Sequence, residues 1–341
     1  MTPSILSILV TGVEGDFGQA LVKALRLCQD PLKIYGCDVE GAGIGSAFVD
    51  RFYRVPYADA ADYLNVLDGI CQTHEIQAVV PGSEQEIAVL SGLGSPPKLP
   101  GGAVVVCQEA AWIEIYGDKL RCMEALEGKV ELACFADGSD SEAVARLIAQ
   151  VGFPVVVKSR QSSGSRTLRV AHNQDELAAY LSEVPLPLAQ QYIDDEGGEF
   201  SIGLFAGRQS ESAIAFRRQL GGPGLSWFAE KSDDLQVLTY SQLIGKVIRL
   251  QGSANVQVRK SGLGVRLLEI NPRFSSLAAA RAICGFRDVE WSVNMALGRE
   301  IALPPASDYR WIRFRRFYHE VVDLGDGFQA VAEWCPRKSG K

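Results

Sequence analysis

A short segment in the C-terminal half of the chain combines a strand-like pattern with groups that bind metals and phosphates. The segment LLEINPRFSS, residues 267–276, starts with apolar residues and carries Glu269, Asn271 and Arg273 at alternate positions. Alternate side chains of a strand point to one face, so these three are predicted to lie together. Magnesium prefers carboxylate and amide oxygens, and a guanidinium binds phosphate oxygens. The segment therefore predicts a magnesium and phosphate site, although an isolated Glu-x-Asn pair also suits a partly exposed salt-bridge cluster.

The preceding strand adds a third oxygen ligand. Its sequence NVQVR places Asn255, Gln257 and Arg259 on one face. The turn KSGLG, residues 260–264, joins this strand to the one that carries Glu269. Two strands joined in this way form a hairpin, in which Gln257 is predicted to lie within about two residues of facing Glu269.

A Gly/Ser-rich loop follows Lys158, the last residue of the apolar run VVVK. The loop SRQSSGSR, residues 159–166, contains one glycine and four serines and ends in Arg166. Its backbone N–H groups and hydroxyls can close over phosphates, with the two cations beside them. A solvated hairpin with incidental charges is the alternative.

The segment TGVEGDFG, residues 11–18, matches the context of a dinucleotide-binding turn. It follows a strand and precedes a helix, and Asp38 ends the next strand, where it would bind ribose hydroxyls. The same turn is also an ordinary way to pack a helix tightly on a sheet. Tyr116 and Lys119 are spaced by three rather than the four of short-chain reductases. We therefore expect no nicotinamide cofactor here.

The composition is that of a globular protein and disfavours several functional classes. Lys+Arg 34 against Asp+Glu 41 gives a formal charge of −7, which argues against a non-specific nucleic-acid binder. No apolar run approaches the roughly 18 residues of a membrane span, and the N-terminus has no basic start. We expect neither a membrane span nor a signal peptide. The eight cysteines form no CxxC pair, which favours reduced thiols and a cytoplasmic location.

The spacing of apolar residues predicts three structural units and a tail. In residues 1–115, strands alternate with helices, which indicates a parallel sheet covered on both faces. Residues 116–187 combine helices with a strand–loop–strand pattern, typical of a small α+β unit. Residues 188–325 are mostly strands joined by turns, with two helices near their end. Residues 326–341 are expected to form a C-terminal tail, of which the last six, PRKSGK, are loose.

A resemblance to a known family lies in residues 252–286. This segment reads GSANVQVRKSGLGVRLLEINPRFSSLAAARAICGF and is similar to the metal-binding segment of ATP-grasp enzymes, especially the large chain of carbamoyl-phosphate synthetase. Lys158 and its loop resemble the family's phosphate-closing lid. Residues 188–205, LAQQYIDDEGGEFSIGLF, resemble the hinge that holds adenine and ribose. The order of these motifs along the chain also matches the family, and the resemblance extends over residues 5–323.

The resemblance implies a fold of α/β and α+β parts. A Rossmann-like pre-ATP-grasp domain, which binds no dinucleotide in the family, would occupy residues 1–115. The ATP-grasp lid subdomain would occupy residues 116–187. A mainly antiparallel C-terminal subdomain with the metal and substrate site would occupy residues 188–325. With one lid and one metal strand, the chain resembles a free-standing ligase rather than the whole synthetase.

The family roles carry over to residues that match its motifs. Glu269 and Asn271 would ligate magnesium that bridges the β- and γ-phosphates, and Gln257 would assist at a second metal. Arg273 would face the γ-phosphate or the acyl phosphate. Lys158 would contact the α- and β-phosphates. The resemblance also implies a set of further ATP-binding residues, namely Lys119, Ser163, Gly164, Ser165, Gln191, Tyr192, Ile193 and Glu199.

Three positions depart from the common family pattern. Gln191 stands where many members have Glu, and Gly203 stands where many have an Asp directed toward the acceptor substrate. Thr167 replaces an extra glycine after the loop. These departures leave the side-chain role of residue 191 open and predict an unusual substrate pocket and a stiffer loop.

The implied function is an ATP-dependent carboxylate–amine ligase that works through an acyl phosphate. ATP and Mg²⁺, as one or two ions with Mn²⁺ as a substitute, would be the cofactors. The substrates would be small, amino-acid-like carboxylates and amines, with no nucleic-acid or membrane partner, and a homodimer is compatible with the sequence. An ATP-grasp kinase and a catalytically silent nucleotide-binding protein are the alternatives.

The last assignment concerns the carboxylate that is phosphorylated. Residues 216–231, FRRQLGGPGLSWFAEK, leave a strand with two arginines and enter a Gly/Pro loop. Only one of Arg217 and Arg218 can face the site, because neighbouring side chains of a strand point to opposite faces. By resemblance, Arg218 is expected to hold the carboxylate together with Arg273. A surface arginine paired with a nearby acid is the alternative.

Overall fold

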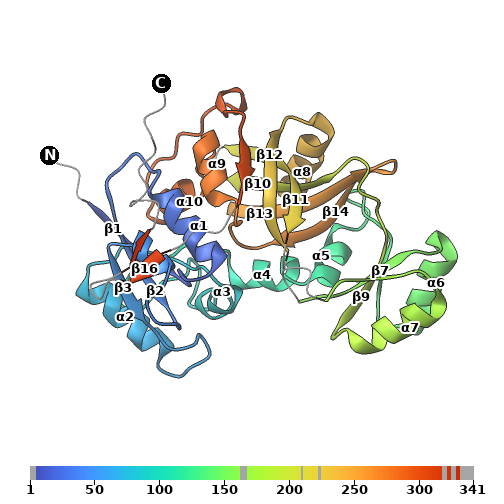
Figure 1. The fold of residues 1–341 in the computed structure, drawn as a ribbon, viewed down its shortest axis with the longest axis horizontal. Coiled ribbons are helices and arrows are strands. Elements are labelled where there is room, and N and C mark those ends of the chain that lie inside the picture. The colour runs from blue at the N-terminus through green and yellow to red at the C-terminus, as the bar shows by residue number, and fades with distance from the viewer. Residues whose placement is uncertain are drawn as a thin grey trace.

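We analysed a computed structural model that describes residues 5–161, 167–208, 210–221, 224–316, 321–323 and 328–330. The predicted ATP-binding residues Ser163, Gly164 and Ser165 lie outside the described residues, as does most of the predicted tail. Figure 1 shows a blue N-terminal sheet and a green unit at opposite ends of the molecule, with a yellow-to-orange sheet above and between them. None of the helices in the described residues has the length and apolar character that a membrane crossing requires.

The N-terminal unit is a parallel five-stranded sheet with strand order β3-β2-β1-β4-β5. One buried apolar core lies on the face covered by α1, and a second lies on the face covered by α2 and α3. This arrangement confirms the predicted parallel sheet with two covered faces. The elements are β1 (Leu6–Thr11), α1 (Asp16–Leu25), β2 (Leu32–Asp38), η1 (Gly45–Phe48), β3 (Arg51–Arg54), α2 (Tyr63–Thr73), β4 (Ala78–Val80), α3 (Glu84–Leu90) and β5 (Val104–Val105).

Close packing explains the glycines between β1 and α1. Gly12 has a φ of +60°, a conformation that favours glycine. A Cβ atom on Gly18 would lie 2.1 Å from the carbonyl oxygen of Gly12. Any larger residue at position 18 would therefore push α1 away from the sheet.

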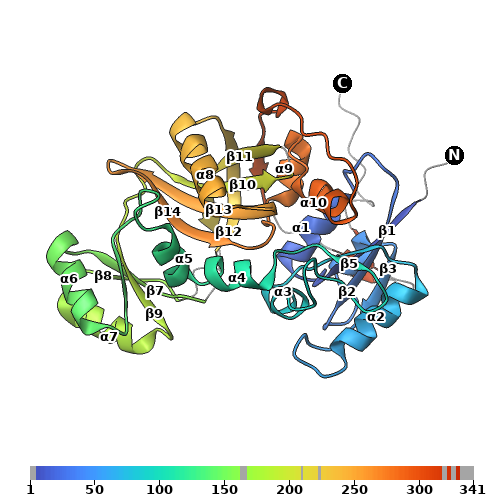
Figure 2. The same cartoon turned by 180° about the vertical axis from the view of Figure 1, so that it is seen from behind.

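The middle unit is a four-stranded antiparallel sheet with strand order β6-β9-β7-β8, covered on one face by α6 and α7. Asp118 caps α5 and Asn173 caps α7, because each side chain accepts hydrogen bonds from backbone N–H groups of the first turn. Figure 2 shows α4 connecting the N-terminal unit to α5. The elements are α4 (Ala110–Tyr116), α5 (Lys119–Leu126), β6 (Phe135–Asp137), α6 (Ser141–Val151), β7 (Val155–Ser159), β8 (Arg169–Ala171), α7 (Gln174–Glu183) and β9 (Pro187–Gln191).

The C-terminal sheet has six antiparallel strands in the order β14-β13-β10-β11-β12-β15. Helices α5 and α8 cover one face, and α9 and α10 pack against the other. A separate pair of strands, β16 (Val321–Asp323) and β17 (Phe328–Ala330), is antiparallel. The other elements are β10 (Glu199–Ala206), β11 (Glu211–Gly221), β12 (Leu225–Ser232), α8 (Leu235–Val247), β13 (Gly252–Ser261), β14 (Gly264–Asn271), α9 (Ala278–Cys284), α10 (Asp288–Ala296), η2 (Ala306–Asp308) and β15 (Arg313–Arg315).

Two elements of this sheet differ from the sequence prediction. The predicted Gly/Pro loop after Arg218 is much shorter, because residues 225–232 form β12 between β11 and β15. The buried positions of β12 include Ser226 and Lys231. These polar residues interrupt the alternation of apolar and polar residues by which a strand is recognised in a sequence. Helix α8 follows directly and was also not expected from the pattern.

Candidate active site

The hairpin of β13 and β14 brings the predicted metal ligands side by side. Gln257 lies directly opposite Glu269, and Asn255 lies opposite Asn271. An irregularity after Gln257 shifts the register of the rest of the hairpin. The side-chain amide of Asn271 donates a hydrogen bond of 3.1 Å to Glu269 Oε1, which leaves its own carbonyl oxygen available to a ligand.

Two lysines from the middle unit surround the Glu269 carboxylate. Lys119 Nζ lies 3.3 Å from Glu269 Oε2, and Lys158 Nζ donates to the backbone oxygen of Leu268 at 3.0 Å. Burial would raise the pKa of Glu269, but the Lys119 charge, the hydrogen bond from Asn271 and the Lys158 charge lower it to about 2. Burial, assisted by repulsion from Lys119, lowers the pKa of Lys158 to about 8. The carboxylate is therefore ionised and surrounded by positive charge.

This donor set suits a magnesium ion that shares its coordination with phosphates. Among the described residues, no group of three or more His, Cys, Asp or Glu side chains could hold a metal by itself. Glu269 instead offers one carboxylate beside the amide oxygens of Gln257 and Asn271. Magnesium completes its octahedron with water and phosphate oxygens. The residues therefore fit a metal–nucleotide complex better than a metal alone.

Glu199 lies between two arginines on neighbouring strands. Arg218 Nη2 is 2.6 Å from Glu199 Oε1, and Arg259 Nη2 is 2.6 Å from Glu199 Oε2. The two arginines outweigh burial and lower the pKa of Glu199. Arg218 also donates to Gln257 Oε1, so it lies beside the predicted metal ligands, whereas Arg217 is exposed. Both oxygens of the predicted ribose ligand are thus engaged by arginines in this structure.

The predicted hinge residues make backbone and side-chain contacts of their own. The side-chain oxygen of Gln191 accepts a hydrogen bond from the Cys134 N–H, and the backbone oxygen of Ile193 accepts one from Arg259. Tyr192 is partly exposed. Gln191 therefore turns toward β6 rather than toward Lys158.

Gln190 is a residue that the sequence analysis missed. It pairs with Val156, so it shares a face of the middle sheet with Lys158, two residues farther along β7. Its side-chain nitrogen is buried and has no hydrogen-bond partner in the described part of the chain. An unpaired donor on the face of Lys158 fits a ligand with hydrogen-bond acceptors, such as a nucleotide base. The two adjacent glutamines at 190 and 191 are visible in the sequence. Only the strand register shows which of their side chains points to the face that carries Lys158.

Arg273 is fixed by the N-terminal unit. Its Nε lies 2.8 Å from Glu84 Oε1, and its guanidinium lies 3.9 Å from the centroid of the Phe17 ring. Its Nη1 donates to the backbone oxygen of Phe274. Glu84 of α3 and Phe17 at the start of α1 therefore hold the arginine that follows β14.

A cavity of about 470 Å³ opens beside these groups. Lys119, Asn271 and Arg273 line it, together with Asp118 and Arg160 of the middle unit. Its volume lies within the roughly 300–1,000 Å³ of small-molecule sites. The predicted metal strand and the middle unit therefore border one space large enough for a substrate.

A buried arginine accounts for the glycine at position 203. The side chain of Arg281 is fully buried, forms an ion pair with Asp288 at 3.2 Å and donates to Asn255 Oδ1 at 2.5 Å. A Cβ atom on Gly203 would lie 2.9 Å from the Arg281 guanidinium. Arg281 thus fills the space into which a side chain at 203 would extend. Its hydrogen bond also fixes Asn255, which lies opposite Asn271.

The polar groups of the glycine-rich turn are engaged within the chain. The Asp38 carboxylate accepts the Glu14 N–H at 2.9 Å. The Glu14 carboxylate accepts N–H groups of Gly43, Gly45 and Ser46 at 2.8 to 3.0 Å. Asp38, the candidate ribose ligand, therefore has a backbone partner already.

Two family models match separate parts of the chain. Residues 6–95 match the family described as PylC-like, N-terminal domain. Residues 185–313 match the family described as ATP-grasp in the biosynthetic pathway with Ter operon. The first match covers most of the parallel sheet, and the second covers the sheet that carries Glu269.

Curated relatives share less than 30% sequence identity with this chain. The large chain of carbamoyl phosphate synthase from Thermus thermophilus is 22% identical over 339 residues, which cover 83% of this chain and 30% of that protein. The formate-dependent phosphoribosylglycinamide formyltransferase of Synechococcus sp. is 29% identical over 136 residues, which cover 38% and 34%. The chain thus spans only about a third of the length of these relatives.

Solved structures share the fold at low sequence identity. The biotin carboxylase domain of the Hydrogenobacter thermophilus 2-oxoglutarate carboxylase, solved with MgADP, ADP and bicarbonate, has a TM-score of 0.72 at 16% identity, over 89% of this chain and 72% of its own. The N5-carboxyaminoimidazole synthetase of Staphylococcus aureus, solved with ADP, has a TM-score of 0.67 at 15% identity, over 87% and 78%.

Proposed function

Because this chain joins a PylC-like N-terminal domain to an ATP-grasp domain, we propose that it is an ATP-dependent ligase that joins a carboxylate to an amine. A carboxylate oxygen attacks the γ-phosphorus of ATP, which gives an acyl phosphate and ADP. The amine then attacks the acyl carbon, and phosphate leaves. The similar proteins include a carbamoyl phosphate synthase and a carboxylase solved with MgADP, which supports ATP and Mg²⁺ as ligands.

The residues around Glu269 carry the charge stabilisation that this reaction needs. Lys119 and Lys158 would bind phosphate oxygens, and Glu269, Asn271 and Gln257 would hold magnesium, which would neutralise phosphate charge. Such a reaction depends on positioning and on fixed charge rather than on a protein nucleophile. Gln190 and the backbone of residues 191–193 hold the base.

Arg218 and Arg273 hold the carboxylate that is phosphorylated. A carboxylate and a γ-phosphate repel each other, and a guanidinium between them lowers that cost. Arg218 lies beside Gln257, and Arg273 lies in the wall of the cavity that contains Lys119 and Asn271. In this assignment, residues 1–115 form the pre-ATP-grasp domain, 116–187 the lid, and 188–325 the subdomain with the metal and substrate site.

The observation that carries the proposal is the ionised Glu269 carboxylate between Lys119 and the two amide side chains. Its test is a screen of small carboxylates and amino acids, singly and in pairs, for release of ADP and phosphate with ATP and Mg²⁺. A ligase releases ADP only when a carboxylate and an amine are both present. ADP release with a single substrate and no nucleophile would indicate a kinase instead, and ATP binding without ADP release under any pair would indicate a silent protein.

A further inference from the structure

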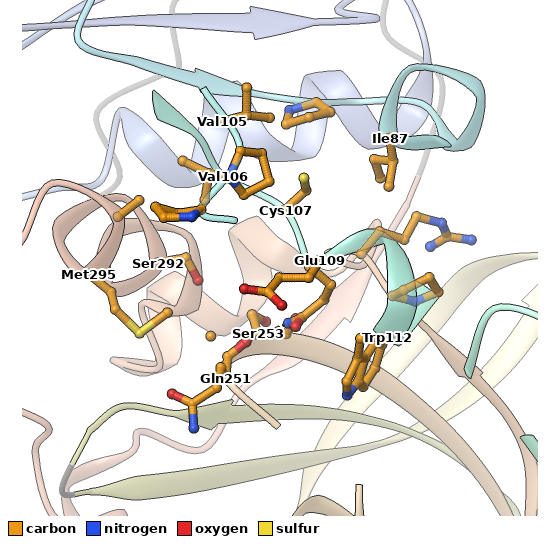
Figure 3. Close-up of a pocket in the computed structure, with 18 of the residues that line it drawn as sticks. Ile87, Val105, Val106, Cys107, Glu109, Trp112, Gln251, Ser253, Ser292 and Met295 are labelled. Carbon is orange, nitrogen blue, oxygen red and sulfur yellow. Dashed lines mark hydrogen bonds between the residues drawn. The ribbon is translucent and has the colours of Figure 1, made fainter. Parts of the chain in front are cut away.

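A second cavity, of about 480 Å³, lies between the N-terminal unit and the start of β13 (Figure 3). Apart from Arg273, none of the described residues that are predicted to bind the nucleotide, the metal or the substrate lines it. Ile87, Pro272 and Arg273 line both this cavity and the one beside Lys119, so they form the boundary between them. Its volume lies within the roughly 300–1,000 Å³ of sites for small molecules.

The walls of the second cavity are largely apolar. Figure 3 shows Val105 and Val106 at the top of the view, Ile87 at the right and Met295 at the left. Phe274, Pro96 and Pro97 complete this surface. A ligand that fits these walls has an aliphatic or aromatic part.

Two rigid contacts fix the shape of the cavity. The buried side chain of Gln108 donates to the backbone oxygens of Gln251 and Ser253 at 2.6 and 3.1 Å. The indole N–H of Trp112 donates to the backbone oxygen of Ile248 at 3.1 Å. The loop before α4 and α4 itself are thus fastened to the start of β13 and the end of α8, and the cavity is preformed.

Groups of opposite charge line the same cavity. Figure 3 shows the Glu109 carboxylate turned into the space below Cys107, between Met295 and Ile87. In the part of the chain that the structure describes, the Ser95 hydroxyl is its only hydrogen-bond donor, which leaves its second oxygen open to a ligand. Arg249 is exposed and lines the same cavity. A carboxylate binds an ammonium group, and a guanidinium binds a carboxylate.

We propose that this cavity is a binding site for a free amino acid with an apolar side chain. Glu109 binds its ammonium group, Arg249 binds its carboxylate, and Val105, Val106 and Met295 contact its side chain. A molecule with only one of the two charges forms only one of these two ion pairs. The site lies outside the nucleotide site and needs no ATP, so its test is independent of the proposed ligase reaction.

The test is calorimetric titration of the full chain, without nucleotide, with L-leucine and L-phenylalanine. We expect at least one of them to bind at millimolar concentration or tighter, and glycine, 4-methylpentanoate and 3-methylbutylamine to bind at least about tenfold more weakly. If neither amino acid binds, or if 4-methylpentanoate binds as tightly as leucine, the proposal is wrong.

Variants at the two charged residues locate the site. Glu109→Gln and Arg249→Asn should each weaken binding about tenfold or more; Asn suits position 249 because its φ is +50°. Glu127→Gln, an exposed change outside both cavities, should leave binding unchanged. Equal affinities in Glu109→Gln and Glu127→Gln, with unchanged melting temperatures, would place the amino acid elsewhere.

Discussion

The ammonium group of Lys119 lies 3.3 Å from the carboxylate of Glu269, although one residue begins a helix of the middle unit and the other lies near the end of a strand of the C-terminal sheet. Asp118 caps that helix and thereby fixes Lys119 as its first residue. The lysine occupies space that a metal ion at Glu269 would also approach. A magnesium–nucleotide complex held by Glu269 would compete with Lys119 for the carboxylate, and its phosphate oxygens would offer Lys119 another partner.

Glu269→Gln should lower ADP release at least about 100-fold, because the site loses its one carboxylate for magnesium while its shape is kept. The measurement is ADP release with an active substrate pair at saturating ATP. Glu127→Gln is the matched control and should behave like the parent protein. Near-normal ADP release by the Glu269 variant at ordinary magnesium would contradict the metal assignment.

ATP affinity should fall as the pH rises above about 8. The pKa of Lys158 is lowered to about 8, so its charge is present below that pH and is lost above it in the nucleotide-free protein. Loss of one cation beside the phosphates should weaken binding roughly tenfold between pH 7 and 9.5. Calorimetry at both pH values measures this change. The Lys158→Met variant should bind ATP weakly at both pH values. If its ATP affinity depends on pH as that of the parent protein does, Lys158 is not the cause of the pH dependence.

Arg218→Ala should raise the Michaelis constant for the carboxylate substrate about tenfold or more, or lower turnover, with ATP affinity little changed. Steady-state kinetics with either substrate varied separates these effects. Arg217→Ala is the matched control, because Arg217 is the exposed neighbour on the opposite face of β11. Loss of activity in the Arg217 variant alone would show that Arg217, and not Arg218, faces the substrate pocket.

Gly203→Ala should destabilise the protein by about 1 to 3 kcal/mol, because the added methyl group meets the fully buried Arg281 guanidinium at 2.9 Å. Gly69→Ala, in the middle of α2, is the control, since no atom lies within 4 Å of its added Cβ. That change should be neutral or stabilising by up to about 1 kcal/mol. Chemical denaturation measures both, and equal stabilities would show that Arg281 moves aside without cost.

Neither NAD nor NADP should bind with a micromolar dissociation constant. Asp38 already accepts a backbone N–H, and the N–H groups of Gly43, Gly45 and Ser46 are held by Glu14. A dinucleotide would have to displace these contacts. Calorimetric titration of the parent protein with each cofactor checks this, and micromolar binding would overturn it.

Local pattern predicts the parts of the site that depend on neighbours in sequence. Glu269 and Asn271 share a face because the strand period is two, and the turn sets Gln257 opposite Glu269. Other parts depend on pairing between distant segments. Gln190 and Gln191 are identical in type, and only the pairing of β9 with β7 decides which one faces Lys158. Their roles could not be separated from the sequence.

The surroundings of Arg273 and Gly203 are equally hidden in the sequence. The contact of Arg273 with Phe17 joins distant parts of the chain, and no local spacing indicates it. Gly203 is recognisable as a departure from the family pattern, but the reason for it is a buried arginine on α9. Such long-range steric relationships follow from the packed structure alone.

The apolar face of α1 has a consequence for how the chain folds as it is synthesised. Leu21 and Val22 of α1 share a buried core with Ala278 of α9 and Val289 of α10. Roughly 250 residues separate α1 from α9, so at the usual speed of translation the helix waits on the order of 10 to 50 s for its partner. During that interval the ribosome-bound N-terminal unit exposes an apolar surface, which offers a binding site to molecular chaperones that act on nascent chains.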